Sequence, residues 1–366
     1  MHTQSMQESE LPSVDVYVIK TPRQWWLAQG ISEHLNKPAV MVLSEGFKGA
    51  HLLKEIIESQ VETRFVKVFW VPGKLTGQEK SWFLATLHRR LEWRGVRNQL
   101  NALLKEFRVN KVFTANLASL PIQYLQTSLE SVPFHVLDDG LESYQYKYVK
   151  PKNKLSLIYS RLKYGFKVKS ASSDSIFPFY TDGWFFNSKI VHKRFKTLKM
   201  HQIQTEWFQT PAVLRTGVLA LQKFGMDVNA WRQPKIVFVF STGEFLSAHC
   251  ANFNLKSFQE KIARFLTAHT VAEHKIWVKY HPRENQGDIF QLASLSNDLR
   301  EVPTTIPFEI LVAGLLPGDL VVGEVSTVLF DIAIKRQDVG VWSLDCIEPG
   351  SEVFYLFKNA EVRFFS

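Results

Sequence analysis

The chain has 366 residues, of which 45% are hydrophobic and 13% are aromatic. This length and apolar content allow two ordinary hydrophobic cores and exclude a disordered chain. The formal net charge of +9 favours an anionic partner. The two cysteines, Cys250 and Cys346, are too few for a disulfide framework, and neither has metal-ligand spacing.

The first fifteen residues are polar and acidic, without the basic start and apolar run of a signal peptide. The apolar run at residues 14–19 is too short to cross a bilayer. We therefore expect a cytoplasmic protein.

Short β-branched, apolar runs alternate with longer stretches of helical periodicity in the first half of the chain. The expected strands are residues 14–19, 39–43, 65–70, 111–114 and 134–137, and the expected helices include residues 25–35 and 78–106. This alternation is typical of a parallel sheet with crossover helices.

Residues 150–233 have weaker periodicity and end in the turn-like Trp231-Arg232-Gln233-Pro234. The alternation then restarts, with expected strands at residues 235–240, 275–279, 319–322 and 339–343 and expected helices at 258–269 and 307–313. The sequence thus predicts two Rossmann-like α/β domains, residues 1–230 and 231–366. Their strand carboxyl ends should face a central cleft that holds the active site.

A basic insert occupies residues 144–170 of the first domain. Its positive side chains alternate with Tyr and Leu, and they are Lys147, Lys150, Lys152, Lys154, Arg161, Lys163, Lys167 and Lys169. A solvated loop and helix face would explain this pattern. Contact with an anionic acceptor or with the inner face of a membrane is the alternative.

Asp138, Asp139 and Gly140 follow directly on the expected strand at residues 134–137. A carboxylate at the carboxyl end of a strand can act as general base on a sugar hydroxyl. A turn followed by a helix N-cap explains the same residues.

The expected strand at residues 275–279 ends at Lys279 and is followed by His281-Pro282-Arg283. Pro282 cannot donate a backbone hydrogen bond and therefore ends the strand pairing. A histidine with Lys279 and Arg283 beside it suits a phosphate, which it can stabilise or protonate. The alternative is a solvated loop histidine.

Three further segments could bind a nucleotide. Ser241-Thr242-Gly243 is a small-residue turn that can bring backbone N–H groups close to an anion. Pro307 and Glu309 suit a first helical turn, where Glu309 could accept hydrogen bonds from a ribose. Ser326 and Thr327 precede the apolar stretch 328–334 and offer hydroxyls at a helix N-terminus, although an ordinary N-cap pair explains them as well.

A D-x-D triplet is absent from the sequence, and so is a His/Cys/Asp cluster with metal spacing. We therefore expect group transfer without a metal or other cofactor.

In this order, Asp138-Asp139-Gly140, His281-Pro282 and Ser326-Thr327 resemble the signatures of the bacterial sialyltransferases. These signatures are an acidic-acidic-Gly motif, a His-Pro motif and a Ser-Ser/Thr pair. Pro307-Phe308-Glu309 is similar to the segment that holds the cytidine ribose in these enzymes. Thr21-Pro22-Arg23-Gln24 is similar to the Thr-Pro-x-Gln of the lipooligosaccharide branch. Polysialyl and marine galactoside-type enzymes share the three signatures, so the acceptor stays open.

The resemblance implies a GT-B glycosyltransferase that moves sialic acid from CMP-sialic acid to a glycan hydroxyl with inversion, in lipooligosaccharide or capsule synthesis. Asp138 would be the general base and Asp139 the alternate. Adjacent residues on an extended segment point to opposite sides, so only one of the two carboxylates can face the acceptor.

The same resemblance distributes the binding roles. His281 would protonate or stabilise the departing phosphate, Ser326 and Thr327 would hold its oxygens, and Glu309 would bind the ribose. The residues assigned to the acceptor side of the cleft are Gly140, Thr21, Gln24 and Asn116.

Two alternatives remain at this point. The donor could be CMP-Kdo, another nonulosonate or a UDP-sugar, or the chain could be a sugar-nucleotide epimerase on the same two-domain scaffold, because fold does not separate these. The net charge also fits a protein that binds nucleic acid or a membrane surface, but no zinc, helix-turn-helix or aromatic ribonucleoprotein signature accompanies it. We therefore expect a nucleotide-sugar donor and a glycan acceptor as partners, and not nucleic acid.

Overall fold

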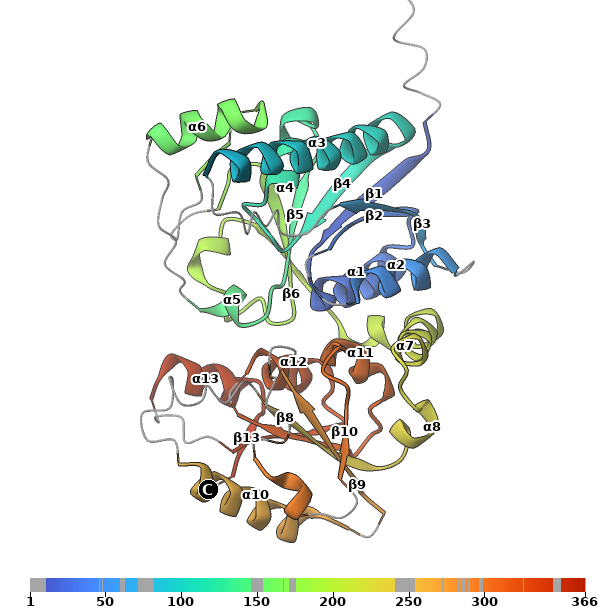
Figure 1. The fold of residues 1–366 in the computed structure, drawn as a ribbon, viewed down its shortest axis with the longest axis vertical. Coiled ribbons are helices and arrows are strands. Elements are labelled where there is room, and N and C mark those ends of the chain that lie inside the picture. The colour runs from blue at the N-terminus through green and yellow to red at the C-terminus, as the bar shows by residue number, and fades with distance from the viewer. Residues whose placement is uncertain are drawn as a thin grey trace, which may run out of the picture. The chain divides into compact units, whose positions relative to one another are not determined.

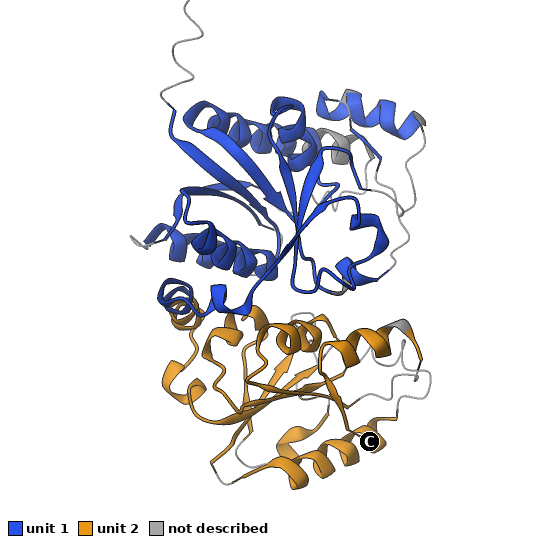
Figure 2. Ribbon diagram, turned by 180° about the vertical axis from the view of Figure 1, so that it is seen from behind, with its two compact units in different colours: residues 1–216 blue, residues 217–366 orange. Residues whose placement is uncertain are grey.

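The structure is a computed structural model. It describes residues 11–45, 47, 49–59, 63–71, 82–145, 154–166, 168–170, 176–240, 254–271, 273–281, 284, 288, 290–295, 299–324, 326–344 and 350–365. The chain forms two compact units, unit 1 (Met1–Thr216) and unit 2 (Gly217–Ser366), which are coloured separately in Figure 2.

Unit 1 is built on a seven-stranded sheet in the order β3-β2-β1-β4-β5-β6-β7, and each neighbouring pair is parallel. The strands are β1 (Ser13–Ile19), β2 (Ala39–Ser44), β3 (Phe65–Val71), β4 (Arg108–Thr114), β5 (Phe134–Leu137), β6 (Tyr180–Phe185) and β7 (Lys199–Gln202). The chain winds outward from β1 to β3 and then returns to β4 on the other side of β1. The order of the strands therefore reverses between β1 and β4.

Helices cover both faces of this sheet, with α1 and α2 on one face and α3 on the other (Figure 1). The helices of unit 1 are α1 (Pro22–Leu35), α2 (Ala50–Ser59), α3 (Trp82–Glu106), α4 (Leu120–Ser128), α5 (Leu141–Tyr144) and α6 (Lys154–Tyr164), with short 3₁₀ turns η1 (Lys193–Phe195) and η2 (Thr205–Phe208). The helix α7 (Pro211–Lys223) contains the division between the two units.

Unit 2 repeats the design with six parallel strands in the order β10-β9-β8-β11-β12-β13. The strands are β8 (Lys235–Phe240), β9 (Lys275–Tyr280), β10 (Leu299–Glu301), β11 (Leu320–Gly323), β12 (Gly340–Ser343) and β13 (Arg363–Phe364). The helical elements are α8 (Val228–Trp231), α10 (Leu255–His269), η3 (Leu292–Ser294), α11 (Phe308–Leu311), η4 (Val312–Gly314), α12 (Thr327–Lys335) and α13 (Glu352–Asn359). Here the strand order reverses between β8 and β11.

A buried ion pair fixes the start of β8 in unit 2. Lys235 Nζ donates to Asp319 Oδ2 at 2.5 Å, and both side chains are buried. Asp319 Oδ1 also accepts from the Lys235 N–H at 3.0 Å, and Oδ2 accepts from the Leu316 N–H at 2.7 Å. The pair therefore ties the start of β8 to the turn before β11.

The structure confirms the prediction of two Rossmann-like α/β units. The expected strands at residues 14–19, 134–137 and 235–240 match β1, β5 and β8 to within one residue. The sequence reading missed β6 and β7, which lie in the region of weak periodicity. Among the helices in the described ranges, none is both long and apolar enough to cross a membrane.

Candidate active site

A cavity of about 460 Å³ opens in unit 1 where the strand order reverses. Its floor and one wall come from the residues that follow β1 and β4 and from the end of β5. The lining residues are Lys20, Thr21, Gln24, Ala115, Asn116, Leu117, Ala118, Val136, Leu137, Asp139, Glu142, Ser143, Ile176, Phe177, Arg194 and Phe195. Open α/β sheets bind ligands in the crevice outside such strand ends, and this volume lies in the range of about 300–1,000 Å³ that small-molecule sites occupy.

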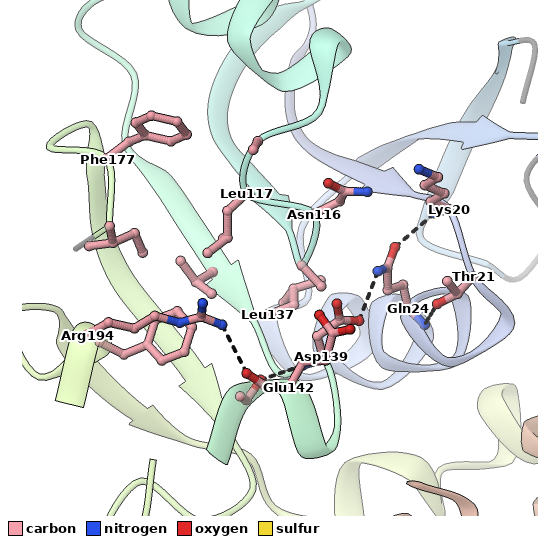
Figure 3. Close-up of a pocket in the computed structure, with 16 residues that line it drawn as sticks. Lys20, Thr21, Gln24, Asn116, Leu117, Leu137, Asp139, Glu142, Phe177 and Arg194 are labelled. Carbon is pink, nitrogen blue, oxygen red and sulfur yellow. Dashed lines mark hydrogen bonds between the residues drawn. The ribbon is translucent and has the colours of Figure 1, made fainter. Parts of the chain in front are cut away.

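The N-terminus of α1 forms one side of the cavity (Figure 3). Thr21 caps the helix, since its Oγ1 accepts from the Gln24 N–H at 3.3 Å, and Pro22 fixes the first turn. The Gln24 side chain is buried. Its Oε1 accepts from the Lys20 N–H at 2.9 Å, and its Nε2 donates to Asp139 Oδ1 at 3.1 Å. The Thr-Pro-x-Gln motif therefore orients a carboxylate of the acidic motif.

Asp138 lies beneath the cavity and has no exposed surface. Its Oδ1 forms an ion pair with Arg23 Nη2 at 2.9 Å and accepts from the Gly140 N–H at 2.9 Å. Its Oδ2 accepts from the Tyr144 hydroxyl and from the Phe186 N–H at 3.2 Å. This carboxylate thus holds together α1, α5 and the end of β6.

Asp139 is partly exposed and lines the cavity. Burial raises the pKa of Asp139 above its ordinary value of 3.8, while the Arg23 charge and the Gln24 hydrogen bond oppose the increase. Its N–H donates to Ser143 Oγ at 2.7 Å, and Gly140 follows with a φ of +70°, which a residue with a side chain rarely adopts. The two adjacent aspartates therefore occupy different environments, and Asp139 is the one that reaches the cavity.

The other wall contains Phe177 and Arg194, which the sequence reading did not select (Figure 3). Arg194 Nη2 donates to the Glu142 carbonyl at 2.9 Å, while its Nε is buried without a hydrogen-bond partner among the described residues. Burial lowers the pKa of the guanidinium, and the charges of Glu142 and Asp139 oppose this decrease. Asn116 lines the cavity from the end of β4. The site thus combines carboxylates, an amide and a guanidinium.

In unit 2, Lys279 is buried at the carboxyl end of β9. Its Nζ donates to the Tyr280 carbonyl at 2.7 Å and to the Thr304 carbonyl at 3.2 Å. Burial lowers the pKa of Lys279 to about 8, and the nearby carboxylate of Glu309 opposes this decrease. Lys279 thus connects the backbone just before His281, which is exposed, to the segment that leads into α11.

The remaining predicted donor residues begin helices. Pro307 is the N-cap of α11, and Glu309 lies in its first turn. Ser326 is the N-cap of α12, since its Oγ accepts from the Leu329 N–H at 3.4 Å, and Thr327 is the first residue of that helix. The other predicted donor residues lie outside the described residues; these are Ser241, Thr242, Gly243, Pro282 and Arg283.

The structure therefore brings Thr21, Gln24, Asn116 and Asp139 together on one cavity of unit 1. In unit 2 His281 follows β9, Pro307 and Glu309 follow β10, and Ser326 and Thr327 follow β11. Because these strands are parallel members of one sheet, the predicted residues share its carboxyl edge. Within the described part of the chain, no group of three or more His, Cys, Asp or Glu side chains is placed to hold a metal ion.

Comparison with known proteins is consistent with this architecture. A sequence profile described as alpha-2,8-polysialyltransferase (POLYST) matches residues 15–344. A search of curated proteins by sequence gave no match.

Among solved structures, the chain is similar to the GT-B domain of a sialyltransferase from Photobacterium damselae, with 16% identity, a TM-score of 0.53 and coverage of 97% of this chain and 100% of that one. It is also similar to an α/β-galactoside α-2,3-sialyltransferase from Photobacterium phosphoreum, with 13% identity, a TM-score of 0.55 and coverage of 97% and 99%. A third similar structure is a 2,6-sialyltransferase from a Photobacterium species, in a ternary complex with CMP and lactose, with 16% identity, a TM-score of 0.55 and coverage of 97% and 78%.

At these identities the solved structures establish the fold, which is that of the GT-B glycosyltransferases. The profile match spans nearly the whole chain and carries the family assignment. The protein therefore belongs to the alpha-2,8-polysialyltransferase family and is a sialyltransferase with the GT-B fold.

Proposed function

We propose that the enzyme transfers sialic acid from CMP-sialic acid to a glycan hydroxyl, with inversion at the anomeric carbon and without a metal ion. The acceptor binds in the cavity of unit 1, and the donor binds at the carboxyl edge of the unit 2 sheet. The observation that carries the proposal is the position of Asp139, a partly buried carboxylate with a raised pKa on a cavity of small-molecule size.

Asp139 acts as the general base in this proposal. The acceptor oxygen attacks the anomeric carbon while Asp139 removes its proton, and the bond between that carbon and the phosphate oxygen of CMP breaks. A base is most effective when its pKa lies close to the operating pH, and burial moves the pKa of Asp139 in that direction. Asp138, which the sequence reading placed first, fits the role less well because its carboxylate is enclosed and engaged by Arg23.

The phosphate of CMP leaves with a negative charge that unit 2 must stabilise. His281 is exposed beyond β9 and can donate a proton or a hydrogen bond to it. Ser326 and Thr327 begin α12, where backbone N–H groups and the helix dipole favour an anion. Because the Ser326 hydroxyl already caps the helix, Thr327 is the better candidate for a direct hydroxyl contact. Glu309 would accept hydrogen bonds from the ribose.

Arg194 gives the acceptor site a positive charge. A guanidinium is suited to a carboxylate because it can donate two parallel hydrogen bonds. In our proposal Arg194 binds an anionic group of the acceptor, such as the carboxylate of a terminal sialic acid. The 2,6-sialyltransferase complex with CMP and lactose is an example in this fold of a cytidine nucleotide and a glycan bound together.

The test is a donor panel with the purified full-length chain. CMP-sialic acid, CMP-Kdo and UDP-sugars are each incubated with and without a sialylated oligosaccharide, with excess EDTA in a parallel series. We expect transfer from CMP-sialic acid that EDTA leaves unchanged. Turnover of a UDP-sugar in place of CMP-sialic acid would overturn the donor assignment, and loss of transfer with EDTA that added metal restores would overturn metal independence.

A further inference from the structure

The helix α6 presents apolar side chains outward instead of burying them. Leu155 is 77% exposed, Ile158 is 58% exposed and Tyr159 is 39% exposed. Their spacing of i, i+3 and i+4 places them on one face of the helix. Single exposed apolar residues are ordinary, but three on one helix face form a continuous patch that favours a partner.

The opposite side of α6 attaches it to unit 1. Ser160 is buried, and α6 packs beside α3, as Figure 1 shows. Trp93 of α3 donates from Nε1 to the Tyr164 carbonyl at 2.8 Å, and the two rings meet edge to face with their centroids 5.8 Å apart. These contacts anchor α6, and with it the apolar patch, to α3.

Positive charge surrounds this patch. On α6, Arg161 is exposed, and Lys163 Nζ lies 5.9 Å from the centroid of the Tyr159 ring. On the neighbouring helix α3, Arg90 and Arg94 are exposed on either side of Leu91, which is itself 51% exposed. In the sequence, residues 143–173 contain eight Lys or Arg residues and no Asp or Glu. The partner should therefore carry negative charge as well as an apolar layer.

We propose that α6 docks the enzyme on the surface of an anionic phospholipid bilayer. Leu155 and Ile158 insert among the acyl chains, while Arg161 and Lys163 bind the lipid phosphates. A helix with aliphatic residues on one face and basic residues beside them lies in the membrane interface in this way. An anionic polysaccharide would use the positive charges but would leave the aliphatic side chains in water. The proposal does not depend on the donor or the acceptor assigned above.

The experiment is co-sedimentation of the full-length chain with vesicles of phosphatidylcholine alone or mixed with phosphatidylglycerol. We expect binding to the mixed vesicles that weakens as salt increases. The double variant Leu155→Ser/Ile158→Ser should bind at least about tenfold more weakly, because it loses the two aliphatic side chains that insert into the bilayer. Arg161→Gln should bind about fivefold more weakly, since one basic residue near an anionic surface contributes about 1 kcal/mol.

Val66→Ser is the matched control, because Val66 is also 58% exposed in unit 1 but lies on β3. It should bind vesicles as the wild type does. All variants should keep the wild-type thermal unfolding temperature and rate of sialic acid transfer from CMP-sialic acid to a soluble acceptor, which separates docking from catalysis.

Equal binding of the double variant and the wild type would overturn the proposal, as would equal binding to both vesicle compositions. Size-exclusion chromatography tests a second copy of the chain as the occupant. A dimer that the double variant converts to a monomer, without vesicle binding by the wild type, would also overturn it.

Discussion

Asp138→Asn and Asp139→Asn remove the same charge from adjacent positions, but we expect one to affect mainly stability and the other mainly catalysis. Asn at position 138 keeps one acceptor oxygen and places an amide N–H₂ where the carboxylate now accepts. The substitution removes the negative charge that pairs with Arg23, and Arg23 is only 4% exposed. Breaking a buried ion pair by removing one partner costs about 3–5 kcal/mol.

The lower end of that range applies because Arg23 also donates to the Asp138 backbone carbonyl, which the substitution keeps. A loss of about 3 kcal/mol lowers the unfolding temperature of a unit of this size by about 6–12 °C, at about 2–4 °C per kcal/mol. Asp139→Asn should change stability by less than about 1 kcal/mol, since an amide oxygen can still accept from Gln24. It should reduce sialic acid transfer by about a hundredfold or more if Asp139 is the general base.

Scanning calorimetry and a transfer assay with CMP-sialic acid measure the two effects on the same preparations. The pH profile gives a further readout. A base works in its deprotonated form, so wild-type transfer should fall as the pH drops through the raised pKa of Asp139, above the ordinary 3.8. This acidic limb should disappear from the residual activity of Asp139→Asn. Transfer by Asp139→Asn at the wild-type rate would refute its role as base, and unfolding of Asp138→Asn at the wild-type temperature would refute the structural role of Asp138.

Three further predictions concern Lys279, the ion pair of Lys235 and Asp319, and His135. Lys279→Met removes the hydrogen bonds that connect the end of β9 to the segment before α11, so steady-state kinetics should show about a tenfold higher KM for CMP-sialic acid with an unchanged KM for the acceptor. Asp319→Asn leaves Lys235 buried without its carboxylate and should cost unit 2 about 3–5 kcal/mol in calorimetry. The double change Lys235→Met/Asp319→Asn should recover most of this loss, because it removes the unpaired charge and keeps an amide oxygen that can accept from the Lys235 N–H. Burial lowers the pKa of His135 from 6.5 to about 4 in the folded protein. As the pH falls, the imidazole is therefore protonated in the unfolded chain at a higher pH than in the folded protein. The free energy of unfolding from urea titrations should therefore fall by up to about 3 kcal/mol between pH 6.5 and pH 4, and His135→Phe should flatten this dependence.

Strands rich in buried apolar residues could be predicted from the sequence, whereas the polar strands β6 and β7 could not. β5 and β8 are apolar apart from His135 and Lys235, and every residue of each strand is buried. The edge strand β7 reads Lys-Met-His-Gln, with none of its residues fully buried, and β6 beside it carries Thr181 and Asp182. The polar residues hide the strand signal at the sheet edge. The turn η1, which contains Arg194, lies between these two strands, so the second wall of the cavity was missed with them.

The candidate site could be predicted as a set of positions but not as a set of side-chain directions. Thr21, Asn116 and Asp139 follow three neighbouring parallel strands, and this alone places them at one edge of the sheet. The choice between Asp138 and Asp139 depends on which carboxylate Arg23 holds. That contact joins residues 115 positions apart, and the sequence gives no local signal for it.

The two sheets share the same strand order, so the position of the site in unit 1 predicts the position of a site in unit 2. In unit 1 the central β1 lies between β2 and β4, and the cavity opens beyond the ends of β1 and β4. In unit 2 the central β8 lies between β9 and β11, so the same rule predicts a ligand crevice beyond the ends of β8 and β11. Ser326 and Thr327 follow β11 at that edge, and His281 follows β9 next to it. The same topological rule thus predicts an acceptor site in unit 1 and a donor site in unit 2. Hydrogen exchange with the donor bound tests the second site, because backbone amides near the ends of β8 and β11 should be protected. Protection far from these strand ends would show that unit 2 does not follow the rule.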